Sequence, residues 1–126
     1  ESILIDDIRV IQKRCIEIAD ELRWLIALIS DTGMRLAEAT GLLIEDIRLN
    51  TELPYVSVHS HSWRPLKTKG SKRDIPLVGK ALWSAKRIKE MSASKFAFPR
   101  YNTSIFTSTI TASVSLNKWL RSEGFG

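Results

Sequence analysis

The sequence has little cysteine, proline and glycine, and it has no long apolar run. Its single cysteine, Cys15, excludes a disulfide framework within the chain, and the apolar residues around it favour a buried thiol over a nucleophile. The apolar run 22–29 is short and contains Arg23, so it does not predict a membrane span. With four prolines and six glycines, no repeat or low-complexity tract interrupts what the composition predicts to be one small globular domain.

Acidic residues are scarce in the second half of the chain. Residues 1–60 hold six Lys and Arg against eleven Asp and Glu, whereas residues 61–126 hold thirteen against three, so the halves carry −5 and +10. Positive charge gathered in one part of a chain favours contact with a polyanion such as nucleic acid. An ordinary solvated surface is the alternative interpretation of the same charge pattern.

Helical spacing of apolar residues dominates both ends of the sequence. Ile8, Ile11, Cys15 and Ile18 recur at intervals of three or four residues, which is typical of one buried helix face. A following segment is apolar on most sides, so we expect it to be central, and Gly33 is expected to end it. The predicted helices cover residues 6–20, 21–30, 35–40, 79–91 and 107–123.

Strand signals are confined to the middle of the chain. Residues 55–59 alternate and are rich in β-forming types, and 63–67 and 73–78 are two further short candidates. Residues 69–72 are the predicted turn between the last two, 43–49 form a turn with a helical or extended tail, and 96–102 form a loop. Helices, then strands, then helices argue against a parallel α/β fold. We therefore expect a mainly α fold with a small three-stranded antiparallel β-sheet (α+β).

An arginine beside a helix break is the first candidate for chemistry. Arg35 lies two residues after Gly33, where backbone geometry would fix its position. A guanidinium can offer two parallel N–H donors to a phosphodiester. The alternative is a surface arginine paired with Glu38, three residues further along a helix.

A basic segment in the second half is the next candidate. It contains Lys67, Lys69, Lys72 and Arg73, around a predicted hairpin turn. A lysine on a hairpin tip suits the binding of a phosphate, and the alternative is a solvated basic hairpin that contacts the DNA backbone without sequence preference.

Both motifs have a spacing that is found together in one protein family. The shared positions are Thr32, Gly33, Arg35, Glu38, Leu42 and Asp46, followed by Lys67, Ser71, Arg73 and residues 75–77. Together they resemble the tyrosine recombinases, or phage integrases, over the first half of that family's catalytic domain. The resemblance implies a partial recombinase catalytic domain. In it Arg35 would hold the scissile phosphate, Glu38 would support that arginine or its neighbourhood, and Lys67 would protonate the leaving 5′ oxygen.

The resemblance also implies partners and further contacts. Lys69 lies on the same face of an extended strand as Lys67 and is the alternative general acid. The expected DNA-contacting residues are Arg64, Lys69, Lys72 and Arg73. The expected partner is duplex DNA, with tetrameric self-association on DNA, no cofactor and a cytoplasmic, nucleoid-associated location.

The implied function is that of a DNA-binding fragment of a site-specific recombinase. Enzymes of this family break and rejoin DNA through a 3′-phosphotyrosyl intermediate. The alternatives are a non-catalytic DNA-binding module, a type IB topoisomerase-like domain, and a purely structural helical domain with an incidental basic surface.

Several residues resemble catalytic groups without occupying their positions. The family's His-x-x-Arg follows the lysine, whereas His61 and Arg64 precede Lys67, so we do not assign them that role. Neither Tyr55, in a predicted strand, nor Tyr101, in a predicted loop, lies where the family's nucleophile would be.

The histidines and one tryptophan complete the set of candidates. His59 and His61, without a second cysteine, offer too few ligands for a zinc site by sequence alone, so no metal site is predicted. They are expected at a sheet edge or facing DNA. Trp63, beside the basic segment, is the one tryptophan expected near DNA.

Overall fold

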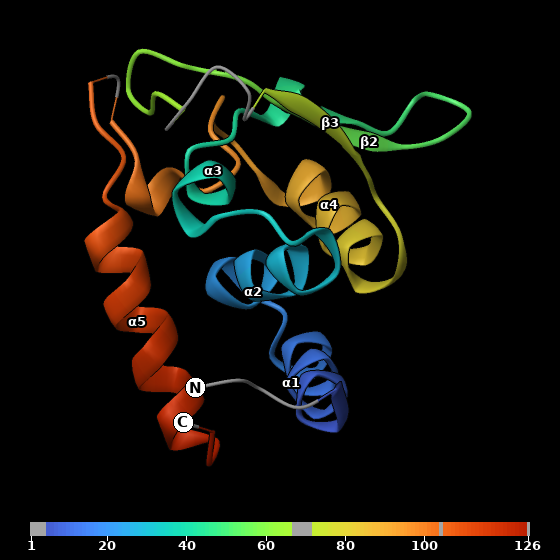
Figure 1. Ribbon diagram of the computed structural model, residues 1–126, viewed down its shortest axis with the longest axis vertical. Coiled ribbons are helices and arrows are strands. Elements are labelled where there is room, and N and C mark those ends of the chain that lie inside the picture. The colour runs from blue at the N-terminus through green and yellow to red at the C-terminus, as the bar shows by residue number, and fades with distance from the viewer. Residues whose placement is uncertain (1–4, 67–71, 104, 126) are drawn as a thin grey trace.

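Five α-helices, two 3-10 turns and three strands are present in the computed structural model, which describes residues 5–66, 72–103 and 105–125 (Figure 1). The elements are α1 (Ile5–Ile18), α2 (Glu21–Thr32), α3 (Leu36–Thr40), η1 (Ile44–Asp46), β1 (Ile47–Arg48), β2 (Tyr55–Val58), β3 (Arg73–Pro76), α4 (Gly79–Met91), η3 (Pro99–Tyr101) and α5 (Thr109–Ser122). The predicted α+β class is confirmed, and all five expected helices are present.

Helix α2 is the centre of the fold. It packs against α1, α3, α4 and α5, which surround it in Figure 1. Leu25, Ala27 and Leu28 are fully buried, as the apolar character of this segment predicts. Its first turn is capped by Asp20, which accepts a hydrogen bond from the Arg23 backbone N–H. Gly33 ends the helix with φ of 69°, so the chain turns away sharply just before Arg35.

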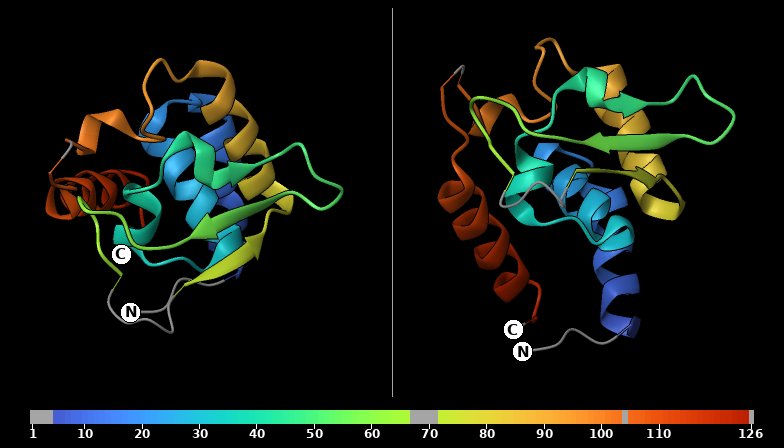
Figure 2. Two further views of the ribbon diagram at one scale, coloured as in Figure 1. Left: turned by 90° about the horizontal axis from the view of Figure 1, so that it is seen from above. Right: turned by 45° about the horizontal axis from the view of Figure 1, so that its top comes forward.

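The sheet is antiparallel with strand order β1-β2-β3. Ile47 pairs with Val56, and Val56 pairs with Ile75 on its other side. Val56 and Val58 are fully buried and belong to the same core cluster as Leu25 and Leu28 of α2. Figure 1 shows the strands on one side of the molecule, above α3 and α4, and Figure 2 gives two further views of the same arrangement.

One predicted strand is wrong in its described part. Residues 63–66 lie outside the sheet, and its third member is β1 instead. The backbone forms a turn, in which the N–H groups of His61 and Arg64 donate to each other's carbonyls at 3.1 and 3.0 Å. Pro65 has no N–H for a ladder bond, and the Trp63 indole N–H donates to the Gly41 carbonyl. Inward hydrogen bonding therefore replaces strand pairing. The predicted turn at 69–72 falls mostly outside the described residues.

Among the residues described, no helix is both long and apolar enough to cross a membrane.

Candidate phosphate-binding site

Arg35 stands at the entrance to α3, as the sequence predicted. Its backbone N–H donates to Oε1 of Glu38 at 2.9 Å, which fixes the main chain at the first turn of the helix. Its side chain remains 58% exposed. The residue thus combines a fixed backbone with a guanidinium that solvent, or a polyanion, can reach.

Glu38 is a buried carboxylate, with only 3% of the residue exposed. Arg73 donates to it through both terminal nitrogens, with Nη1 to Oε2 and Nη2 to Oε1 at 3.0 Å each. The Arg35 Nη1 lies 4.0 Å from Oε2, at the limit of an ion pair. The hydrogen bonds from Arg73 lower the pKa of Glu38, so it is ionised near neutral pH. Glu38 therefore holds the Arg73 fork and the Arg35 main chain.

Two guanidinium groups consequently share one carboxylate at the start of α3 and β3. Arg73 is 37% exposed at its side chain, so both arginines reach the surface. Two positive charges against one negative charge leave this cluster, Arg35, Glu38 and Arg73, with a net charge of about +1, which favours an anion. Glu38 orients the Arg73 fork, and a planar guanidinium fork suits the oxygens of a phosphate.

Arg64 does not match its predicted role as a DNA contact. It is 3% exposed, and its Nη1 donates to the His59 carbonyl at 2.8 Å. Burial lowers the pKa of Arg64, while the nearby carboxylates of Asp46 and Glu38 act in the opposite direction. A Cβ at Gly41 would lie 2.6 Å from Cγ of Arg64, so this close packing requires glycine. Arg64 is an interior residue whose charge is not presented to a duplex.

The predicted hairpin lysines are only partly placed. Lys72 is exposed directly before β3. Lys67 and Lys69 lie outside the described residues, so the choice between them stays a prediction.

A second polar cluster was missed by the sequence reasoning. Asp46 is 1% exposed at its side chain, and its Oδ2 lies 2.8 Å from Nε2 of His61. Its Oδ1 lies 3.6 Å from Nε2 of His59. The pairing of Ile47 with Val56 brings the residue before β1 beside the end of β2. Because β1 has only two residues, the sequence contains no alternating pattern from which the pairing of β1 with β2 could be predicted.

The aromatic residues take structural positions. Trp63 stacks on the His61 ring with centroids 4.5 Å apart and contacts Phe96 edge-on at 5.5 Å. Tyr101 is 2% exposed in η3, and its hydroxyl has no hydrogen-bond partner within the described residues. Tyr55 is half-buried on β2. Tyr101 is therefore a core residue rather than the loop residue that the sequence suggested.

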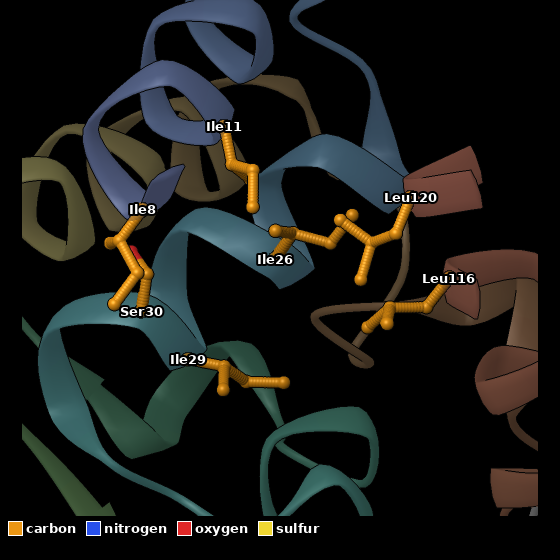
Figure 3. A pocket seen from close by; sticks show the side chains of 7 residues that line it. All are labelled: Ile8, Ile11, Ile26, Ile29, Ser30, Leu116 and Leu120. Carbon is orange, nitrogen blue, oxygen red and sulfur yellow. The ribbon is translucent and has the colours of Figure 1, made fainter. Parts of the chain in front are cut away.

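A separate apolar pocket lies between α1, α2 and α5, with a volume of about 240 Å³ (Figure 3). Figure 3 shows isoleucine and leucine side chains converging on it, with Ser30 as its one polar residue. The Ser30 hydroxyl donates to the Ala27 carbonyl and accepts from Gln12. None of the predicted site residues lines this pocket, and its walls offer no charged group to a substrate.

Comparison with protein-family models, curated proteins and solved structures found no match to this chain.

Proposed function

We propose that this chain binds the phosphodiester backbone of duplex DNA through Arg35 and Arg73, as the first half of a catalytic domain of the tyrosine recombinase type. The observation that carries the proposal is the cluster in which buried Glu38 holds the Arg35 main chain and the Arg73 fork at one surface. The spacing of the motif residues from Thr32 to Asp46 supports it independently, because this spacing resembles that of the tyrosine recombinases.

Each member of the cluster has a separate part in this proposal. Arg35 supplies a guanidinium to the scissile phosphate and neutralises charge that develops during cleavage. Arg73 contacts a neighbouring backbone phosphate, and Glu38 holds both arginines in position. Lys67 gives a proton to the leaving 5′ oxygen, as the resemblance implies. Strand cleavage would further require the tyrosine, histidine and second arginine that the family uses, for which this chain offers no match.

A non-catalytic DNA-binding module is the second candidate. The charge of +10 on residues 61–126 favours it, because a basic surface binds DNA without any active site. The two functions differ at Arg35, which lies in the acidic half.

The proposal is tested by measuring the affinity for a labelled duplex. Fluorescence anisotropy reports this affinity at a series of salt concentrations. Replacing Arg35 by alanine should weaken binding, because one phosphate contact is lost. The negative slope of log K against log salt should become less steep by about one unit. The matched control is Arg48→Ala, which removes an exposed arginine from β1 and should change neither quantity.

Two results would count against the proposal. If Arg35→Ala bound DNA like the unaltered chain while Lys72→Ala bound weakly, the basic-module interpretation would be preferred. If Arg48→Ala lost as much affinity as Arg35→Ala, the binding would reflect overall charge and not this site.

A further inference from the structure

Asp46, His59 and His61 form a set of side chains that the proposed DNA-binding function does not use. One ligand atom from each lies within 4.8 Å of the other two. The carboxylate comes from η1, and the imidazoles follow β2, so the set joins two segments distant in sequence. Two imidazole nitrogens and one carboxylate oxygen are a ligand combination that proteins use for zinc with an open fourth position.

The two imidazoles converge on the Asp46 carboxylate, where His61 forms a hydrogen bond that a shared ion would replace. Both imidazoles direct Nε2 at the same carboxylate, one towards each oxygen. Oδ2 of Asp46 already accepts the Leu43 backbone N–H at 2.9 Å. Oδ1, which faces Nε2 of His59, is therefore the oxygen that an ion would take.

Surrounding contacts resemble those that orient metal ligands in proteins. The Ser57 hydroxyl lies 3.4 Å from Nδ1 of His59, the ring nitrogen that an Nε2-bound ion would leave for a second partner. Stacking on Trp63 fixes the plane of the His61 ring. The His59 side chain is 35% exposed, so an ion can enter from solvent on that side.

We propose that Asp46, His59 and His61 bind one Zn²⁺ ion, with water completing a four-coordinate site. Tetrahedral zinc holds its ligand atoms about 3.3 Å apart, so ligand atoms that here lie within 4.8 Å of one another must approach by up to about 1.5 Å on binding. Zinc bound at Nε2 of His61 would leave that neutral ring with its one proton at Nδ1. Bound zinc would tie η1 to the chain that leaves β2 towards Lys67.

Neighbouring charges affect the expected strength of zinc binding. The positive charge of Arg64 interacts with Asp46 and so opposes the binding of a zinc ion there. The negative charge of Glu38, which also interacts with Arg64, offsets part of this effect. With three protein ligands and this competition, affinity should fall below that of closed four-ligand zinc sites.

The composition makes a direct test practical, because His59 and His61 are the only histidines in the chain. Titrating the protein with Zn²⁺ while recording imidazole nitrogen NMR signals should shift both Nε2 resonances together and saturate at one ion per chain. Calorimetry gives the affinity. His59→Gln should weaken it by at least about 100-fold, more than the loss of an outer-shell partner costs.

Two further variants distinguish binding of zinc by the Asp46 carboxylate from a general effect of negative charge. Asp46→Asn keeps an oxygen for the Leu43 N–H and so preserves the turn, but should lower zinc affinity at least about tenfold. Glu45→Gln removes the adjacent exposed carboxylate and should leave affinity unchanged. Failure of either imidazole to shift at millimolar zinc, or equal affinity in His59→Gln or Asp46→Asn, would overturn the proposal. None of these outcomes depends on DNA binding.

Discussion

Glu38 is the residue on which the arrangement of the candidate phosphate site depends. Its carboxylate accepts the Arg35 backbone N–H and both terminal nitrogens of Arg73. Helical spacing made a contact between Glu38 and Arg35 predictable. The stronger contact is with Arg73, 35 residues away, and this pair depends on how β3 crosses the start of α3.

Replacing Glu38 by glutamine should lower the free energy of unfolding at pH 7 by about 1–3 kcal/mol, because the ion pair between Glu38 and Arg73 is lost while Arg73 remains partly hydrated. The pKa of Glu38 is lower in the folded state than its ordinary value of 4.5. Its stabilisation is therefore complete above 4.5 and is lost as pH falls through the folded-state pKa. The difference between Glu38→Gln and the unaltered protein should shrink at low pH, as measured by urea unfolding followed by tryptophan fluorescence.

The control for this measurement is Glu52→Gln, which alters an exposed loop carboxylate. A difference between Glu38→Gln and the unaltered chain that stays constant from pH 7 to pH 3 would contradict an ionic role for Glu38.

At the scale of elements, the ends of helices decide where Arg35 lies. The Gly33 N–H donates to the Ile29 carbonyl at 3.0 Å, closing α2 two residues before the arginine. Helix ends have strong sequence signals, and this one was predicted. The short strand β1 has no such signal, because two residues cannot show an alternating pattern. Residues 63–67 showed strand-like composition, but inward hydrogen bonds from Trp63 and Arg64 override it in the described part.

Gly33→Ala should destabilise the protein by about 1 kcal/mol, because a side chain in the left-handed region is strained. A Cβ there meets no described atom within 4 Å, so the cost is conformational and not steric. Gly33→Asn should cost less, since asparagine adopts this conformation more readily. Thermal unfolding of the two variants checks the order. An alanine variant as stable as the glycine protein would show that the turn can relax.

At the scale of the whole molecule, two apolar clusters hold the helices together. The larger joins α2 and α4 to the sheet, and the smaller joins α1, α2 and α5 around Cys15 and Trp119. Cys15 is fully buried, which confirms the thiol environment predicted from the sequence. Burial raises the pKa of Cys15 to about 12.

Cys15 should consequently react with a thiol reagent only when the smaller cluster opens. At pH 8 the folded protein should label far more slowly than the same chain in urea, where the thiol pKa returns to about 8.5. The rate of absorbance change on adding an aromatic disulfide reagent measures this. Rapid, complete labelling of the folded chain would mean that α1 or α5 detaches readily from α2.

The sequence alone determined the features that depend on neighbouring residues. Apolar spacing placed the helices, Gly33 placed the break before Arg35, and residue counts revealed the basic second half. These signals are local, since helix periodicity and glycine conformation act within a few residues.

Tertiary structure decided which distant polar groups meet. It paired Glu38 with Arg73, buried Arg64 against Gly41, and brought Asp46 to His59 and His61. Each contact depends on strand register and on which side chains the core covers. The strand register and the covered side chains result from packing the whole chain around α2. A one-residue change of register would direct the strand side chains to the opposite face of the sheet.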